Sequence, residues 1–577
     1  METLSFSKTH PFMDVSFARN HCINLTEHSS LNIINPLKNL YTRKSVEIAK
    51  PPEETSTAKL SRKKQSLHEI IFKPLQRFIS TFNDSNLNLP PFLDPKQLLS
   101  GNLSPADELP PTACEVVEGS LPPSLDGGAY IQNGPNPHFY PRGPYIFPDG
   151  DGMLHSIKIS GGKPVFCSRF IQTFKYTTER DLGHPIFPNI VAFFCSNLTP
   201  SMVLTLAQLL LAKINPFVDG LGTANTSLAL IGGRLHALTE TDLPYQVKIR
   251  PDGEITTVGR HDFFSRDFFL TMTAHPKIDP DTGETFAFRY FVVPPFLTYF
   301  RINSDGTKQR DVPIFSLKSP SYIHDFAVTK NHAIFPDPQI VIRPFEILRG
   351  RPVLRVDADK VSRVGVIPRY AEDEREMFWI DEPGLNMLHV VNAWEEDDGD
   401  TIVIVASNIL SVEHVLEQIN LIHLSLEKIV IDAKTKKVVM RRPLSDSSLD
   451  FGVINPQYAQ RKNRYVYAAV IESMPKMVGA VKMDLSLSAA DCTVASRMYG
   501  PGCYGSEPIF VAREEAEEED DGYLVAYVTN ENTQESQFIV MDAKSATLEI
   551  VAAVKLPHRV PQGFHSIFVK ESELKRL

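Results

Sequence analysis

The sequence lacks several features that would assign it to a common class of protein. No apolar run reaches the ~18 to 20 residues with which a helix spans a bilayer. The 577 residues carry a formal net charge of -10, and an acidic chain argues against nonspecific binding of nucleic acid. The six cysteines include no CxxC pair, so no disulfide framework is predicted. We expect reduced and mostly buried thiols.

The N-terminal part lacks the compact apolar core of a secretory signal. Residues 1–45 are rich in Ser, Thr, Asn and His, which favours an organelle transit peptide, although Glu2, Asp14 and Glu27 are unusual in such a segment. Residues 46–104 are predicted to form a linker and then a basic amphipathic helix, because apolar residues repeat at helical spacing from Leu67 to Ile79. That helix could pack on the body or lie on a membrane surface.

One further segment is a candidate for membrane contact. The stretch Met202–Ala212 (MVLTLAQLLLA) is too short to cross a bilayer and is flanked by Pro200 and Pro216. It predicts a short apolar helix, either in the core or dipping into one leaflet. In the second case the entry point for an apolar substrate would be formed by Leu206, Leu209, Leu210 and Leu211.

From residue ~105 to the end, short alternating or apolar runs are separated by turns, which is typical of an all-β protein. The segments Pro251–Gly253 and Ser304–Gly306 have the composition of hairpin turns. Few helical segments interrupt the strands, and Glu413–Glu427 is the best of them. Residues 105–577 are too many for one sandwich but fit a β-propeller with seven or so blades of ~65 residues each.

Four of the 17 histidines lie at or beside short apolar runs: His275, His324, His389 and His565. A histidine taken alone is most often an ordinary core or surface residue. In a propeller, however, inner strands of different blades converge, so one inward histidine from each of four blades would form a ring. Four imidazoles suit iron, zinc, copper or nickel. A structural zinc would be satisfied by them, whereas octahedral Fe(2+) would keep two positions for dioxygen and substrate.

Three carboxylates follow or lie within apolar runs: Glu240, Glu472 and Glu507. Each could be an ordinary turn residue. Alternatively, each could accept the second N–H of a metal-bound imidazole, as carboxylates near metal sites usually do.

Several segments now identify a family. They include QNGPNP (132–137), DGDGMLH (149–155), MTAHPKIDPDTGETFAFRY, SPSYIHDFAV, NAWEEDDGD and PHRVPQGFH. From ~105 to 577 the chain resembles plant carotenoid cleavage dioxygenases, and in particular their type-four plastid subfamily. The resemblance implies a seven-bladed propeller with a helical cap, and Fe(2+) held by the four histidines. It also implies that Glu240, Glu472 and Glu507 each orient one ligand.

Two positions depart from the family pattern. Gln132 stands where relatives usually carry Arg, and Ser473 follows Glu472 where Pro is usual, so the role of Glu472 is the least secure. Neither position is a metal ligand, and we expect the metal site to survive both changes.

The resemblance implies oxidative cleavage of one C=C bond of a carotenoid or apocarotenoid by O2, giving two carbonyl products. Cleavage at the 9,10 (9′,10′) bond would release a C13 ketone such as β-ionone. The resemblance also implies a plastid location, with the enzyme on a membrane or plastoglobule. Three alternatives remain open: another reaction on the same scaffold, such as 7,8 cleavage, isomerohydrolysis or stilbene cleavage; cleavage of 9-cis-epoxycarotenoids toward abscisic acid; and carotenoid binding without turnover.

Overall fold

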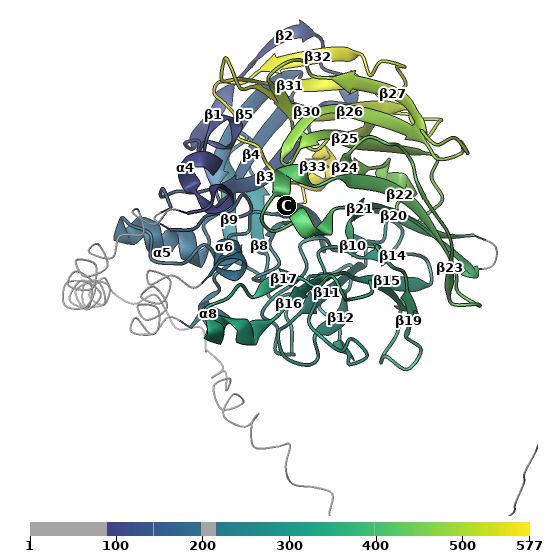
Figure 1. Cartoon of the computed structure of the whole chain (residues 1–577). Helices are drawn as coiled ribbons and strands as arrows, with labels where there is room; N and C mark the ends of the chain where they lie inside the picture. The colour runs from purple at the N-terminus through teal and green to yellow at the C-terminus, as the bar shows by residue number, and fades with distance from the viewer. Residues whose placement is uncertain (1–88, 142, 198–214, 397–398, 577) are drawn as a thin grey trace, which may run out of the picture. The chain divides into compact units, whose positions relative to one another are not determined.

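A computed structural model describes residues 89–141, 143–197, 215–396 and 399–576, all within the compact unit Pro74–Leu577 (Figure 1). The predicted transit peptide (1–45) and the amphipathic stretch Leu67–Ile79 lie outside these residues. So do the four leucines of the apolar stretch, Leu206, Leu209, Leu210 and Leu211.

Seven antiparallel sheets form the seven blades of a β-propeller, which confirms the predicted fold. Blade 1 contains β1 (Leu109–Ala113), β3 (Ala129–Asn136), β4 (Asp151–Ser160), β5 (Lys163–Phe170) and β33 (Ser566–Val569). Blade 2 contains β6 (Ser227–Ile231), β7 (Arg234–Leu238), β8 (Tyr245–Ile249) and β9 (Ile255–Arg260). Blade 3 contains β10 (Lys277–Ile278), β11 (Thr285–Tyr290), β12 (Leu297–Ile302) and β13 (Val312–Ile314).

The remaining blades follow in chain order. Blade 4 contains β14 (Ala327–Val328), β15 (His332–Asp337), β18 (Arg363–Pro368) and β19 (Phe378–Asp381). Blade 5 contains β20 (Met387–Glu396), β21 (Thr401–Ile409), β22 (Leu424–Asp432) and β23 (Lys437–Pro443). Blade 6 contains β24 (Leu449–Val453), β25 (Tyr465–Ser473), β26 (Lys476–Asp484) and β27 (Thr493–Met498). Blade 7 contains β2 (Glu115–Gly119), β28 (Cys503–Gly505), β29 (Ile509–Ala512), β30 (Gly522–Asn530), β31 (Glu535–Asp542) and β32 (Ile550–Lys555).

The other described elements are short. A separate two-stranded sheet is formed by β16 (Ile340–Ile342) and β17 (Leu354–Val356). The α-helices are α4 (Pro95–Leu98), α5 (Phe174–Leu182), α6 (Ile190–Cys195), α8 (Pro216–Asp219) and α9 (Glu571–Leu574). The 3-10 helices are η3 (Pro91–Leu93), η4 (Gly101–Leu103), η5 (Pro123–Leu125), η6 (Pro344–Arg349), η8 (Val412–His414), η9 (Ile419–Leu421) and η10 (Pro456–Tyr458). Helices α4, α5, α6 and α8 gather on one side of the described unit (Figure 1).

The ring of blades is closed by strands from the two ends of the described chain. Near the C-terminus, β33 pairs with β3 inside blade 1, from Ala129↔Val569 to Gln132↔Ser566. From the N-terminal side, β2 pairs with β32 and so becomes part of blade 7. Because each end completes a blade begun by the other, opening the ring would expose two sheet edges.

Seven apolar clusters hold the blades together, and each lies between two successive blades. The cluster between blades 7 and 1, for example, contains the fully buried Phe166 and Phe538. The cluster between blades 3 and 4 contains Phe288 and Phe335. The described propeller therefore has no single core but a ring of cores, and each blade is fixed by the two beside it.

The local sequence explains the strands and turns of a blade. In β8 buried and half-buried residues alternate, as expected for a strand that lies between two differently packed faces. The turns predicted at Pro251–Gly253 and Ser304–Gly306 lie at the ends of β8 and β12, where Gly253 and Gly306 have φ values of 91° and 87°. Residues with a side chain rarely adopt such values, which confirms the turns.

The helix predicted over Glu413–Glu427 is wrong. That segment forms η8, η9 and the first residues of β22. The apolar residues do recur at helical spacing, but β22 pairs with β21 along its whole length, from Ile409↔Leu424 to Thr401↔Asp432. Pairing with the neighbouring strand outweighs the weak local preference for a helix.

The described cysteines agree with the predicted reduced state. Cys114, Cys167, Cys195, Cys492 and Cys503 are free, and three of the five are buried. Burial raises the pKa of Cys195 to about 12. A thiol held neutral in this way is a weak nucleophile, so a structural role fits it better than a catalytic one.

The segment around His155 lies in blade 1. His155 lies on β4, is 3% exposed, and neither ring nitrogen has a hydrogen-bond partner among the described residues. Burial, together with repulsion from His558 and Arg559, lowers the pKa of His155 from 6.5 to about 3. The folded protein therefore contains a neutral imidazole that would gain a proton on unfolding in mild acid.

We predict that His155 makes the fold sensitive to acid. Its depressed pKa stabilises the fold above pH 6.5, and this contribution is lost as pH falls from 6.5 toward 3, by about 1.4 kcal/mol per pH unit. In His155→Leu that part of the slope should vanish. Denaturant unfolding of both proteins between pH 7 and about pH 4 measures the difference, and parallel profiles would contradict the prediction.

Candidate metal centre

Four histidines converge on one point, as the sequence predicted. The candidate ligand nitrogens of His275, His324, His389 and His565 all lie within 4.8 Å of one another. The Nε2 atom of His324 is 3.1 Å from that of His275 and 3.1 Å from that of His389. These residues are far apart in sequence and meet because each belongs to the innermost strand region of a different blade.

The elements that position the ligands follow one pattern. His275 precedes β10, His324 precedes β14 and His565 precedes β33, whereas His389 lies inside β20. Each of these strands is at the end of its sheet order, in blades 3, 4, 1 and 5 respectively. The strand ends of a propeller's blades meet near the axis, which brings the four side chains together.

Three of the four rings are oriented by carboxylates through their Nδ1 atoms. Nδ1 of His324 is hydrogen-bonded to Glu240, which lies between β7 and β8 of blade 2. Nδ1 of His389 is 2.9 Å and 3.0 Å from the two carboxylate oxygens of Asp450 on β24 of blade 6. Nδ1 of His565 is 3.1 Å from Oε1 of Glu507, between β28 and β29 of blade 7.

The structure therefore corrects one expected carboxylate. Glu240 and Glu507 lie where the sequence predicted, but Glu472 is exposed on β25, and Asp450 takes the place expected for it. In β25 the buried Ile471 precedes Glu472, so strand alternation turns Glu472 outward. Asp450 was not predicted from the sequence, although an acidic residue between Leu449 and Phe451 in an apolar run could have indicated a carboxylate with a buried partner. No carboxylate among the described residues contacts the ring of His275.

The three orienting carboxylates are themselves held by further donors. The hydroxyl of Tyr290 donates to Oε2 of Glu240 over 2.6 Å. Oγ of Ser407 donates to Oδ1 of Asp450 over 2.6 Å. The backbone N–H of Ser566 donates to Oε2 of Glu507 over 2.7 Å. Because both oxygens of each carboxylate have partners, the ligand rings cannot rotate without breaking these bonds.

This arrangement fits a transition-metal ion. A neutral imidazole whose Nδ1–H donates a hydrogen bond to a carboxylate turns the lone pair of Nε2 toward the centre. The Nε2 atoms of His324 and His389 are only 3.1 Å apart, and their lone pairs would repel each other unless a cation lies between them. Two nitrogens bound at right angles to one ion by bonds of about 2.1 Å would be about 3.0 Å apart. Imidazole ligands suit iron, zinc, copper and nickel.

The pKa shifts of three of the four histidines are compatible with a metal site. Burial, with repulsion from the other three rings, holds the pKa of His275 well below 6.5. Burial also lowers the pKa of His389, against the opposing effect of Asp450. Burial lowers the pKa of His324 too, but the carboxylate of Glu240 outweighs it and the net pKa is raised. Metal ligands must be neutral imidazoles, so His275 and His389 are ready to bind without losing a proton.

The aromatic ring of Phe451 lies against two of the four histidines. The ring of Phe451 is 5.3 Å from the rings of both His389 and His565. Phe451 follows the orienting Asp450 and has a φ of 51°, a left-handed backbone conformation that costs free energy for a bulky residue. This conformation lets two successive side chains serve one centre: Asp450 fixes a ligand, and Phe451 provides an apolar wall beside it.

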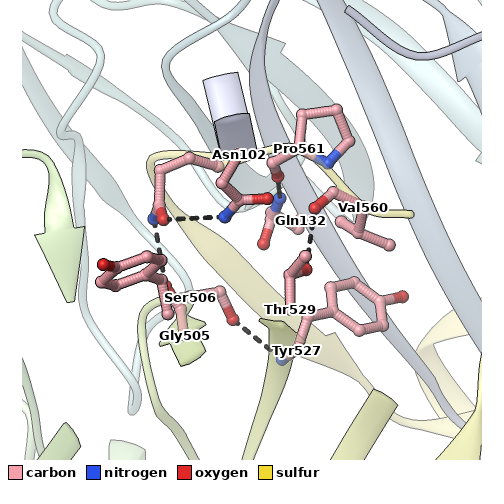
Figure 2. Close-up of a pocket in the computed structure, with 10 residues that line it drawn as sticks. Asn102, Gln132, Gly505, Ser506, Tyr527, Thr529, Val560 and Pro561 are labelled. Carbon is pink, nitrogen blue, oxygen red and sulfur yellow. Dashed lines mark hydrogen bonds between the residues drawn. The ribbon is translucent and has the colours of Figure 1, made fainter. Parts of the chain in front are cut away.

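Gln132, which departs from the family pattern, lies elsewhere. It lines a small polar cavity together with Asn102, Thr529 and Gln562, and none of the four histidines lines that cavity. Figure 2 shows Gln132 directed at Pro561, to whose carbonyl Nε2 donates over 3.1 Å. The cavity of about 10 Å³ has room for roughly one water molecule. Among the described residues, the side chain of Gln132 is hydrogen-bonded to Pro561 and to none of the four histidines.

We predict that Asp450, and not Glu472, supports metal binding. Asp450→Asn removes the charge that orients His389 and should weaken the binding of a divalent transition-metal ion about 10- to 100-fold. Glu472→Gln is the matched control and should bind like the wild type. Competition with a chelator measures both affinities. Weaker binding in Glu472→Gln, or unchanged binding in Asp450→Asn, would contradict the assignment.

Comparisons with known proteins agree with this geometry. The family described as retinal pigment epithelial membrane protein (RPE65) matches residues 102–570. The chain is 54% identical to the probable carotenoid cleavage dioxygenase 4, chloroplastic, of Arabidopsis thaliana, over 89% of this chain and 87% of that protein. It is 52% identical to the chloroplastic 9-cis-epoxycarotenoid dioxygenase NCED1 of Oryza sativa subsp. japonica, over 87% and 80% of the two chains.

A solved structure shows the same fold. The crystal structure of cobalt-substituted Synechocystis apocarotenoid oxygenase superimposes with a TM-score of 0.67 at 25% identity, over 83% of this chain and 99% of that one. The fold, the converging histidines and the extent of these matches agree with the family that the sequence motifs indicated. The chain belongs to the RPE65/carotenoid oxygenase family and, within it, to the carotenoid cleavage dioxygenases.

Proposed function

We propose that this protein is an Fe(2+)-dependent dioxygenase that cleaves one C=C bond of a carotenoid or apocarotenoid. One oxygen atom of O2 would enter each of the two carbonyl products as the double bond breaks. The observation that carries the proposal is the convergence of the Nε2 atoms of His275, His324 and His389 while carboxylates hold Nδ1 of His324 and His389. The family supplies the class of substrate.

Fe(2+) bound by the four imidazoles would supply the binding and activation of dioxygen. The described residues have separate tasks around it. The four histidines would hold the ion, and Glu240, Asp450 and Glu507 would keep three of their rings in place. Phe451 would face the polyene with an apolar surface, and aromatic faces pack well against such a chain.

For the bond that is cut, the proposal is the 9,10 (9′,10′) double bond, with release of a C13 ketone such as β-ionone. It is supported by the resemblance to the type-four subfamily and by the 38% identity to the carotenoid 9,10(9′,10′)-cleavage dioxygenase of Crocus sativus. The second candidate is cleavage of a 9-cis-epoxycarotenoid, which the 52% identity to a 9-cis-epoxycarotenoid dioxygenase favours. Mass spectrometry of products from a small carotenoid panel separates the two, and also tests 7,8 cleavage.

We predict that His275→Ala abolishes iron binding and carotenoid cleavage together while the fold persists. His275 provides one of four converging nitrogens, and its ring contacts no carboxylate among the described residues, so its removal leaves no buried charge unpaired. Iron content, circular dichroism and aerobic incubation with Fe(2+) and β-carotene measure the three properties. His414→Ala, on η8 and outside the cluster, is the control. Full iron content with full activity in His275→Ala would refute the proposed function.

The proposal places the enzyme in plastids. The composition of residues 1–45 favours a transit peptide, and the names of both similar proteins include the word chloroplastic. Residues 46–104 would then join this peptide to the propeller domain of residues 105–577. Import into isolated chloroplasts, with and without residues 1–45, tests the placement.

We further propose that the enzyme associates with the surface of a plastid membrane or plastoglobule, from which it takes its apolar substrate. None of the described helices has the length and apolar content needed to cross a bilayer. The candidate insertion residues Leu206, Leu209, Leu210 and Leu211 belong to this proposal on sequence grounds alone.

A hairpin in the described part of the chain also supports membrane association. It inserts β16, η6 and β17 between β15 and β18 of blade 4. Its tip exposes Phe345 (76%) and Leu348 (83%). The same hairpin carries four arginines, of which Arg349, Arg351 and Arg355 pair with Glu346 and Arg343 pairs with Asp357, so basic residues outnumber their acidic partners there. Exposed apolar side chains close in sequence to an excess of basic residues are typical of a surface that binds anionic lipid.

We predict that the double variant Phe345→Ser/Leu348→Ser binds lipid vesicles at least tenfold less tightly, since each such side chain contributes about 1.5–3 kcal/mol when fully buried. Sedimentation with phosphatidylcholine vesicles, with and without phosphatidylglycerol, measures the binding. Val494→Ser/Met498→Ser on β27, an exposed apolar pair on blade 6, is the matched control. Equal binding by both variants would show that the hairpin tip is not a membrane contact.

A further inference from the structure

A partly buried salt bridge links the segments that carry three of the four histidines. Lys277 lies two residues after His275, Asp325 directly follows His324, and Val390 directly follows His389. Nζ of Lys277 is 2.8 Å from Oδ1 and 3.0 Å from Oδ2 of Asp325. The backbone N–H of Val390 donates to Oδ2 of Asp325 over 2.7 Å, and Nζ of Lys277 reaches the carbonyl of Val390 over 3.3 Å.

These contacts form a closed set across blades 3, 4 and 5. Asp325 is 2% exposed and also accepts the backbone N–H of Phe326 over 2.7 Å, so both carboxylate oxygens are fully used. A buried carboxylate tolerates no loss of partners, because an unpaired charge in the interior costs several kcal/mol. The segments of His275, His324 and His389 are therefore held at a fixed spacing, because the carboxylate of Asp325 must keep its partners on all three.

The contacts of Lys277 and Asp325 hold the one histidine segment that no orienting carboxylate holds, that of His275. Glu240, Asp450 and Glu507 fix the rings of His324, His389 and His565, but no described carboxylate contacts the ring of His275. The backbone around His275 is instead tied to that of the next two ligands through Lys277 and Asp325. Nothing in the proposed reaction requires Asp325 to touch substrate or metal.

We propose that Asp325 is a positioning residue that sets the spacing of His275, His324 and His389 around the metal ion. The inference rests on the proposed function, because it requires that the cluster binds metal. In Asp325→Asn the side chain would present one amide N–H₂ toward donors, either Lys277 or a backbone N–H. One strand would then have to move, and the four nitrogens would no longer fit one ion.

The test compares two Lys–Asp pairs, each with a buried aspartate. The control pair is Lys482–Asp520, whose side chains are 6% and 11% exposed and whose lysine also donates to a backbone carbonyl, that of Ala543. Asp325→Asn and Asp520→Asn are each loaded with Co(2+). We expect Asp325→Asn to bind at least tenfold less tightly with a changed Co(2+) absorption spectrum, and Asp520→Asn to keep affinity within twofold and the wild-type spectrum. Denaturant unfolding shows how much stability each has lost.

A second pair of variants keeps the proposal falsifiable if Asp325→Asn fails to fold. Lys277→Arg retains a donor for Asp325 and should keep the wild-type spectrum, whereas Lys277→Met should show the same change as Asp325→Asn. A wild-type spectrum in Lys277→Met, or an equal loss of affinity in Asp520→Asn, would overturn the inference. Failure of the wild type to bind Co(2+) or Fe(2+) would overturn the proposed function instead, so the two failures are distinguishable.

Discussion

The meeting of four imidazole nitrogens at one point depends on the closure of the whole ring. Blades 1, 3, 4 and 5 carry the histidines, and blades 2, 6 and 7 carry Glu240, Asp450 and Glu507. No blade is without a part in the centre. Because each blade is fixed by apolar clusters on both sides, a shift of one blade would be transmitted around the ring. The rigidity of the propeller is therefore what makes a site from seven separate segments possible.

The charges around the histidine cluster explain why the cluster can be half-buried among apolar residues. Four neutral imidazoles would leave the charge of a bound divalent ion uncompensated, and the three carboxylates one ring away would offset it. Each carboxylate is further satisfied by Tyr290, Ser407 or the backbone of Ser566, so none is left unpaired in the interior. The Lys277–Asp325 pair adds no net charge and links strands instead of rings.

The hairpin of β16, η6 and β17 connects the periphery to the same centre. The N–H of Tyr322 donates to the carbonyl of Ile340 at the base of the hairpin over 3.0 Å, and Tyr322 contacts Nδ1 of His324 over 3.1 Å. The N–H of Val353 donates to the carbonyl of Phe194 on α6, just before the apolar stretch of the sequence. The hairpin and His324 are thus connected through Tyr322, which bonds the hairpin through its backbone and His324 through its side chain.

The sequence by itself determined the all-β propeller, its hairpin turns and the four histidines, because strand alternation, glycine turns and family motifs are properties of short segments. It also indicated Glu240 and Glu507. Only the tertiary structure decided that Asp450, and not Glu472, orients His389, since both are acidic residues in apolar strands of blade 6 and differ in the direction they face. It likewise decided that Glu413–Glu427 supplies a strand where its local pattern favours a helix, and that Asp325 joins three blades. These outcomes depend on partners far away in sequence, and the free energy of pairing and of satisfying a buried charge exceeds any local preference.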